Sequence, residues 1–204
     1  MYTAKASFFD GQVQAPWAAD EYSTEELAKL ERVFDILGDL AGWTILEPGC
    51  GTGRLTDILS GRVGPRGRVI ALDISPGMIG EARKRLAERA NVDLLVAAVE
   101  DLDLSQGSVD LVFCHQVFPH IEDKARALGM FHRALNLGGR LILFHLIGFQ
   151  EINDVHRKAG SVVEGDLMPE AQVMRSLMTG RGFRIEILQD HDFDCYFLSA
   201  VKIC

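Results

Sequence analysis

A glycine-rich turn flanked by two acids is the part of the sequence best suited to chemistry. In "ILEPGCGTGRL", residues 45–55, glycines stand at positions 49, 51 and 53, directly after an apolar run that contains Glu47. Asp73 closes the next apolar run, "VIALDIS". Glycine permits positive φ and a close approach of the main chain to a ligand, and such a turn between a strand and a helix usually meets a nucleotide. Phosphate, dinucleotide and sulfonium cofactors are all open at this point.

The spacing of the turn argues against two of these cofactor classes. A dinucleotide fingerprint, G-x-G-x-x-G, fails from Gly49 because Arg54 takes the third glycine position, and from Gly51 because Thr56 takes it. No Gly-Lys-Ser/Thr follows, so a phosphate loop is excluded more firmly. Glu47 would repel pyrophosphate. A nucleoside with little phosphate fits better, with its ribose hydroxyls on Asp73 and an amino group near Glu47, and NAD is a poor second.

Short apolar runs alternate with amphipathic segments along the part of the chain that holds these residues. Strands are predicted over 43–48, 67–75, 92–99, 108–117 and 138–147, and helices over 53–59, 76–90, 122–135 and 169–183. The end of the chain breaks the rhythm, because two apolar runs in 183–203 are joined at "DHDF" with no helix between them, which forces an antiparallel hairpin. The predicted fold is α/β, a Rossmann-like doubly wound sheet of seven mostly parallel strands with a C-terminal antiparallel hairpin.

The chain length predicts one domain over residues 1–204. Residues 1–40 are expected to form an N-terminal helical arm, in which Ser23 or Thr24 caps a helix and Glu26 completes a capping box before a stop at Gly38. Residues 148–166 interrupt the alternation after the fifth strand and are expected to form a lid-like insertion.

Composition sets limits on partners and location. The net charge of -8 and the absence of long Lys/Arg runs predict no nucleic-acid partner. No apolar run approaches the length of a membrane span, and four scattered cysteines without a secretory signal predict a reducing, cytoplasmic location. The oligomeric state is open.

Four stretches resemble a known family. They are "ILEPGCGTGRL", "VIALDISPGMI", "VEDLDLSQGSVDLVFCHQVFPHIED" and "ALNLGGRLILF". In this order and spacing they resemble the successive motifs of class I S-adenosylmethionine-dependent methyltransferases, over about residues 43–146. The terminal hairpin matches that fold too. The resemblance implies S-adenosylmethionine as cofactor, S-adenosylhomocysteine as product and in-line transfer of a methyl group to a small-molecule acceptor, whose identity the sequence does not give.

The resemblance also assigns the cofactor contacts. The methionine part would meet Glu47 and the glycine turn, the ribose would meet Asp73, and the adenine would pack on Ile74 and Met78. In many relatives an acid after the third strand contacts the adenine amino group, but Ala98 stands at that position here. The full expected cofactor set is Glu47, Gly49, Cys50, Gly51, Gly53, Asp73, Ile74, Met78, Val99, Glu100 and Asp101.

His115 and His145 are the first and second candidates for a general base. Each lies at the end of a predicted strand, His115 where relatives face the transferred methyl group, although a structural role is an equal alternative for His115. Other residues are expected to form a lid or to contact the acceptor: Phe9, Trp17, Glu151, His156 and Arg157. No HxxxH or HExxH spacing links the histidines, so no metal site is predicted.

Two other functions are compatible with the same residues. The first alternative is a non-catalytic S-adenosylmethionine-binding or sensor protein, which would share the glycine turn and both acids. A NAD-dependent dehydrogenase is a distant third, because the turn lacks the dinucleotide register.

Overall fold

The structure is a computed structural model that describes residues 2–190 and 194–203. Contacts within the chain group it into two compact units, Met1–Ala97 and Ala98–Cys204, and each is described by itself. The prediction of one domain over the whole chain stays a prediction.

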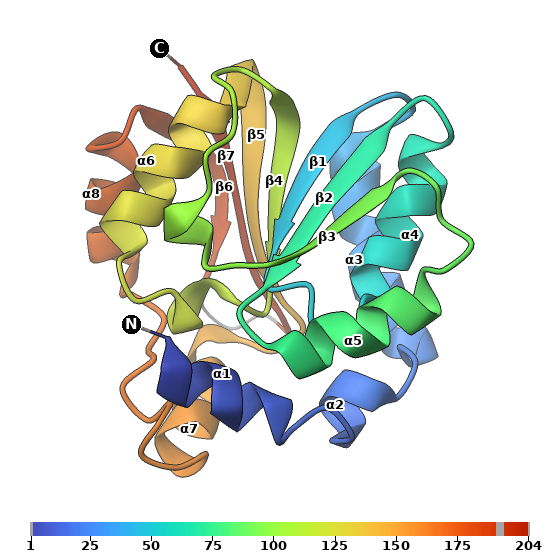
Figure 1. The fold of residues 1–204 in the computed structure, drawn as a ribbon. Helices are drawn as coiled ribbons and strands as arrows, with labels where there is room; N and C mark the ends of the chain where they lie inside the picture. Colours follow the sequence, from blue (N-terminus) through green and yellow to red (C-terminus); the bar gives the residue numbers. More distant parts are fainter. Residues whose placement is uncertain (1, 191–193, 204) are drawn as a thin grey trace. The chain divides into compact units, whose positions relative to one another are not determined.

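The first unit holds three parallel strands and five helices. Its elements are α1 (Thr3–Asp10), α2 (Pro16–Ala19), α3 (Thr24–Leu37), β1 (Thr44–Pro48), α4 (Arg54–Val63), β2 (Arg68–Asp73), α5 (Pro76–Arg85) and β3 (Val92–Val96). The strands pair in the order β3-β2-β1. α4 and α5 pack on these strands, and α1 lies against α5 (Figure 1). Parallel pairing brings the carboxyl ends of β1 and β2 to the same edge, where Glu47 and Asp73 lie.

Helix boundaries in this unit follow the local sequence. The predicted capping box of α3 is present, because the Glu26 amide donates to Ser23 Oγ at 3.2 Å and the Ser23 amide donates to Glu26 Oε2 at 2.7 Å. The helix ends at Gly38, whose φ of 77° suits glycine. α5 begins at Ser75, which caps it, and Pro76 occupies its first turn. It ends at Arg85 rather than near residue 90.

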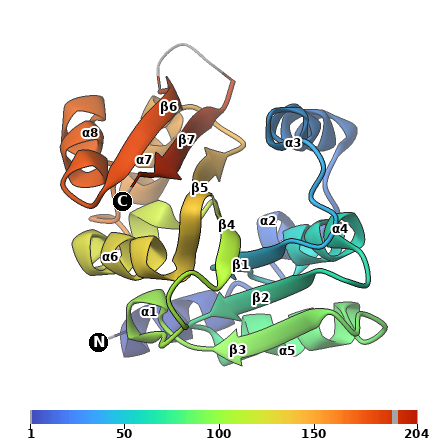
Figure 2. The same cartoon turned by 90° about the horizontal axis from the view of Figure 1, so that it is seen from above.

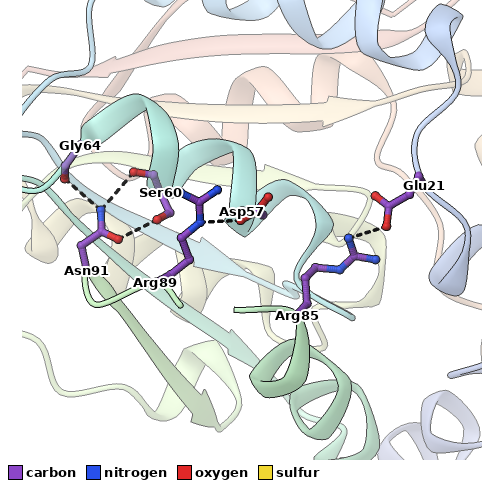
Figure 3. A network of polar contacts seen from close by, with 7 residues as sticks. All are labelled: Glu21, Asp57, Ser60, Gly64, Arg85, Arg89 and Asn91. Carbon is purple, nitrogen blue, oxygen red and sulfur yellow. Dashed lines mark hydrogen bonds and ion pairs between the residues drawn. The ribbon is translucent and has the colours of Figure 1, made fainter. Parts of the chain in front are cut away.

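Asn91 connects the end of α4 to the start of β3. Its Nδ2 donates to the carbonyls of Ser60 and Gly64 at 3.0 and 2.9 Å, and its Oδ1 accepts from Ser60 Oγ at 2.6 Å (Figure 3). The two carbonyls belong to the last turn of α4, where intrahelical donors run out. Asn91 therefore acts as a side-chain cap for this helix. Close by, Arg89 pairs with Asp57 at 2.7 Å on the surface.

Replacing Asn91 by alanine is expected to lower the free energy of unfolding by about 2–3 kcal/mol. Three hydrogen bonds are lost, and the Ser60 carbonyl keeps only the Gly64 amide as a donor among the described residues. Arg89→Ala is the matched control, since it removes an ion pair whose side chains are 40% and 39% exposed, and we expect it to change stability by less than about 1 kcal/mol. Urea denaturation measures both variants. Equal losses would contradict the capping role of Asn91.

The second unit holds four strands and the remaining helices. Its elements are the 3-10 turns η1 (Val99–Asp101) and η2 (Phe118–His120), the strands β4 (Val109–His115), β5 (Leu135–His145), β6 (Phe183–Gln189) and β7 (Tyr196–Lys202), and the helices α6 (Lys124–Ala134), α7 (Phe149–Lys158) and α8 (Ala171–Thr179). β4 and β5 are parallel, β7 pairs antiparallel with both β5 and β6, and the order is β4-β5-β7-β6. α6 and α8 lie along one face of these strands (Figure 2).

The seven strands confirm the predicted fold class, with parallel pairing before a C-terminal antiparallel hairpin. The predicted connection at "DHDF" includes residues 191–193, which lie outside the described residues. None of the helices in the described ranges is long and apolar enough to cross a membrane.

One local prediction in this unit was wrong. The glycine pair was expected to open the fifth strand, but β5 begins at Leu135, so Gly138 and Gly139 lie inside it. The pairing between β4 and β5 is irregular there, and a side chain at position 139 would collide with the carbonyl of Asn136 at 2.9 Å. Within the predicted insertion at 148–166, α7 is a regular helix with Ile152 and Asn153 buried. That this segment acts as a lid stays a prediction.

Candidate functional site

The glycine turn connects β1 to α4 and has the backbone conformation that its glycines predict. Gly49, Gly51 and Gly53 have φ values of 68°, 54° and 84°, a region that disfavours residues with a side chain. A Cβ built on Gly51 would meet no atom of the described chain within 4 Å, so this part of the turn is open to a ligand. A Cβ on Gly53 would lie 3.0–3.2 Å from Leu86 and Ala82. The third glycine therefore serves the packing of the turn against the α5 region.

The Asp73 carboxylate is held in place by the backbone on both sides. Its Oδ2 accepts a hydrogen bond from the Gly51 amide at 3.0 Å, and its Oδ1 accepts one from the Ser75 amide at 2.9 Å. Carboxylate oxygens have about two acceptor sites each. The carboxylate is thus oriented by the turn and by the start of α5.

Glu47 is a buried acid at the end of β1. It is 2% exposed, and within the described chain its Oε2 has no hydrogen-bond partner. Burial raises the pKa of Glu47 to about 8; the charge of Asp73 adds to the rise and the Thr56 side chain opposes it in part. A buried carboxyl group normally has a partner. This orphaned oxygen beside the open turn fits a ligand that carries a positively charged amino group.

The N-terminal arm packs directly on the glycine turn. Thr52 Oγ1 donates to the Ala18 carbonyl at 2.5 Å, and the Arg54 guanidinium donates to the carbonyls of Trp17 at 2.5 Å and Asp20 at 2.7 Å. The same guanidinium lies 4.3 Å from the centre of the Tyr22 ring. Burial, the largest of several influences, raises the pKa of the Tyr22 hydroxyl. The arm is therefore part of the wall around the turn.

The predicted lid residues Phe9 and Trp17 lie in this arm and contact each other. Their rings meet edge to face with centroids 6.4 Å apart, and Trp17 is 49% exposed. Both residues belong to the first unit, where the arm packs on the turn and on α5. Whether they cover a cofactor stays a prediction.

The other predicted cofactor residues of the first unit are more enclosed. Cys50 is buried, and its amide donates to the Leu72 carbonyl at 2.9 Å. Met78 is 1% exposed and packs inside the fold, while Ile74 is half-buried.

Three predicted cofactor residues belong to the second unit. Val99 and Glu100 are buried and Asp101 is exposed. Glu100 Oε1 accepts from the Asp123 amide at 3.2 Å, and Asp101 pairs with Arg126 at 2.9 Å. The structure thus brings Glu47, the turn and Asp73 together within one unit, and it gives residues 99–101 structural contacts of their own.

The two candidate bases end neighbouring strands of the second unit and are both buried. His115 Nδ1 lies 3.3 Å from the Phe144 carbonyl. Within the described chain, Nε2 of His145 has no hydrogen-bond partner. Burial lowers the pKa of His145 well below its ordinary value, and the nearby His115, His120 and His156 add to the effect. A neutral His145 is suited to hydrogen bonding more than to taking up a proton.

Asp166 joins two further histidines to this region. Its Oδ2 lies 2.8 Å from His120 Nδ1, and its carbonyl lies 2.5 Å from His156 Nδ1. The rings of His120 and His156 are 4.6 Å apart. Burial is the main cause that lowers the pKa of His156. The histidines of η2, β5 and α7 therefore influence one another electrostatically, but no group of three or more potential ligands in the described ranges is arranged to hold a metal ion.

The remaining acceptor candidates lie on the outside of α7. Glu151 and Arg157 are exposed, and Arg157 pairs with Asp154 one turn away at 3.1 Å. Sequence reasoning also passed over Asp166, which stands at the end of the predicted insertion. Its contact with His120 spans 46 residues of sequence, and no local spacing signals such a contact.

Comparison with known proteins finds a family match over the middle of the chain. Residues 46–143 match the family model described as a methyltransferase domain. A demethylmenaquinone methyltransferase from Lactococcus lactis is 38% identical over 52% of this chain and 43% of its own length. A ubiquinone biosynthesis O-methyltransferase from Xanthomonas oryzae is 37% identical over 52% of this chain and 44% of its own length. The chain thus matches less than half of the length of either curated relative.

Solved structures agree on the fold. A SAM-dependent methyltransferase from Aquifex aeolicus superposes with a TM-score of 0.73 at 20% identity, and the alignment covers 97% of this chain and 98% of that one. The family and these structural neighbours imply S-adenosylmethionine as the cofactor. Residues 46–143 thus match the methyltransferase domain family, and the chain has the class I fold seen in S-adenosylmethionine-dependent methyltransferases.

Proposed function

We propose that this protein transfers the methyl group of S-adenosylmethionine to a small-molecule acceptor. The observation that carries the proposal is the constellation of Glu47, Gly51 and Asp73 at the carboxyl ends of β1 and β2. It combines an orphaned buried acid, an open glycine turn and a carboxylate fixed by two amides. The buried acid can pair with the ammonium group of the cofactor, and the open turn lets the methionine part approach the main chain closely. The fixed carboxylate can accept hydrogen bonds from the two ribose hydroxyls.

Each residue has a distinct part in holding the cofactor. The Glu47 carboxylate would receive the amino group, and the Gly49–Gly53 turn with Cys50 would support the methionine portion. Asp73 would accept hydrogen bonds from the ribose hydroxyls. Ile74, Met78 and residues 99–101 are proposed for the adenine end, where the packing of Met78 and the ion pair of Asp101 leave Ile74 and the backbone of Val99 as the better candidates.

Methyl transfer requires mainly that the protein align the acceptor with the methyl group of the cofactor. The bound cofactor supplies an electrophilic methyl group on a sulfonium sulfur. This chain's residues must hold an acceptor in line with it and exclude water. A general base is needed only if the acceptor arrives protonated. His115 is the first candidate, and His145, whose charged form is disfavoured by burial, is better suited to orient the acceptor through Nε2.

The relatives indicate the class of acceptor. Among the curated relatives are methyltransferases named for demethylmenaquinone, ubiquinone biosynthesis and aklanonic acid. We therefore propose that the acceptor is a small organic molecule. From the net charge of -8 we propose that the protein has no nucleic-acid partner. A cytoplasmic location is proposed from the cysteine pattern of the sequence.

Calorimetry with S-adenosylmethionine and with NAD tests the cofactor. We expect micromolar binding of the first and no comparable binding of NAD; tighter binding of NAD would refute the proposal. Turnover is then tested by release of S-adenosylhomocysteine in the presence of a panel of small phenols, quinols and carboxylic acids. Binding without release across the panel would favour the alternative, a non-catalytic binding or sensor protein.

A further inference from the structure

Asp10, at the last residue of α1, reaches across to the start of α5. Its Oδ1 accepts a hydrogen bond from Ser75 Oγ at 2.5 Å and another from the Gly77 amide at 2.8 Å. The partners are 65 and 67 residues away in sequence. A carboxylate is favourable at a helix N-terminus, where amides lack intrahelical partners. The arm is therefore attached at the helix that follows Asp73.

Ser75 connects this contact to the proposed ribose acid by a continuous chain of hydrogen bonds. Its hydroxyl donates to Asp10 and accepts from the Met78 amide at 3.0 Å, while its own amide donates to Asp73 Oδ1 at 2.9 Å. Ser75 is fully buried. A hydroxyl has one proton to donate, and because Asp10 takes it, that proton does not compete with ribose hydroxyls for Asp73.

The chain makes room for Asp10 at one specific position. A Cβ on Gly77 would lie 2.8 Å from Asp10 Oδ1 and 3.2 Å from Val13 Cγ2. A Cβ on Gly80, in the same helix, would meet nothing within 4 Å. A methyl group at position 77 would therefore displace the Asp10 carboxylate from its hydrogen bonds, and the same methyl group at position 80 would not.

We propose that Asp10 is a positioning residue of the cofactor site, which couples docking of the N-terminal arm to ribose recognition through Ser75 and Asp73. The inference rests on the proposed role of Asp73. Asp10 touches neither cofactor nor acceptor. It fixes the Ser75 hydroxyl and the start of α5, so Asp73 is positioned for the ribose only when the arm is in place.

The coupling has a reciprocal consequence. If a docked arm favours the cofactor, a bound cofactor must favour the docked arm by the same factor. Amide hydrogen exchange in α1 should therefore slow when S-adenosylhomocysteine binds. Other contacts also hold the arm, among them Arg85 with Glu21 at 2.6 Å (Figure 3), but that pair does not reach Asp73 through the hydrogen bonds described above.

The test compares S-adenosylhomocysteine with its 2′-deoxy analogue by calorimetry on five variants of the full chain. Asp10→Ala and Gly77→Ala are expected to weaken binding of S-adenosylhomocysteine about 10-fold, within the usual range of coupling between sites, and to reduce its preference over the deoxy analogue. Asp10→Asn keeps an acceptor oxygen and should retain most of the affinity for S-adenosylhomocysteine and most of the preference over the deoxy analogue. Gly80→Ala and Glu21→Gln are the controls and should bind as the wild type does.

Hydrogen exchange provides the second readout. Ligand-induced protection of α1 should be lost in Asp10→Ala and retained in Gly80→Ala. If Asp10→Ala lowers thermal stability but leaves the preference for the ribose hydroxyl intact, Asp10 is a structural contact only and the inference is wrong. If Asp73→Asn and Asp73→Ala both bind the two ligands as the wild type does, the proposed role of Asp73 is wrong and the inference fails with it. If the wild type binds neither ligand, the proposed function itself fails.

Discussion

Replacing Asp73 by alanine is expected to weaken binding of S-adenosylmethionine by about 100-fold or more, since each hydrogen bond from a ligand hydroxyl to a charged carboxylate contributes about 1.5–3 kcal/mol. The carboxylate is already oriented by the amides of Gly51 and Ser75. The carboxylate therefore loses little conformational entropy when the ribose binds, and most of the hydrogen-bond energy contributes to affinity. Calorimetry measures the change.

The same substitution also removes the acceptor of two backbone amides, so a loss of stability must be separated from a loss of binding. Asp73→Asn keeps one acceptor oxygen and serves for this purpose, with titrations done well below the melting temperature of each variant. Asp93→Ala, on the adjacent strand, is the matched control because that acid forms only a surface pair with Arg68 among the contacts described. Unchanged affinity in folded Asp73→Asn and Asp73→Ala would refute the role of Asp73.

Glu47→Gln is expected to change stability and binding in opposite directions. The pKa of Glu47 rises from 4.5 to about 8 in the folded protein. The folded state therefore binds the proton more tightly, and this stabilising contribution is complete below pH 4.5 and lost as pH rises through 8. Between pH 5 and pH 9 the free energy of unfolding of the wild type should fall by an amount on the order of 4 kcal/mol from this group alone. Glutamine does not ionise, so the variant should not show this fall. Urea denaturation at both values tests this.

Binding should show the reverse effect. A neutral amide cannot pair with the cofactor's ammonium group, so affinity should fall by about 100-fold, the order expected when one partner of a buried charged pair is lost. In the wild type at pH 7, pairing requires Glu47 to ionise, and binding should release about one proton. Calorimetry in buffers of different ionisation enthalpy detects it. The exposed Glu88 provides the control, Glu88→Gln. Proton release that persists in Glu47→Gln would assign it to another group.

The fold was predictable because its signals are local. Strands β1 to β7 come from short apolar runs, the start of α3 from its capping box, and the positive φ values of the turn from glycine itself. The missing dinucleotide register limits the nucleotide class through residue spacing alone. The prediction failed where strand pairing overrides the tendency of glycine to break a strand. Gly138 and Gly139 lie inside β5, which pairs with β4, and do not start the strand.

The sequence predicted only some residues of the candidate site. Glu47 and Asp73 stand out because strand ends meet at one edge of a parallel sheet. Asp10 and Arg54 do not, since their partners lie 34 to 67 residues away and neither position follows a period or motif. Only the structure shows that the environment of His145 disfavours its charge, because residue spacing does not reveal burial.

A crystal structure of the protein with S-adenosylhomocysteine tests the central claim most directly. The account predicts the ligand against the Gly49–Gly53 turn, with both ribose hydroxyls within hydrogen-bond distance of Asp73 and the amino group on Glu47 Oε2. A ligand bound elsewhere, or one bound at the turn with its ribose away from Asp73 and its amino group away from Glu47, would contradict it.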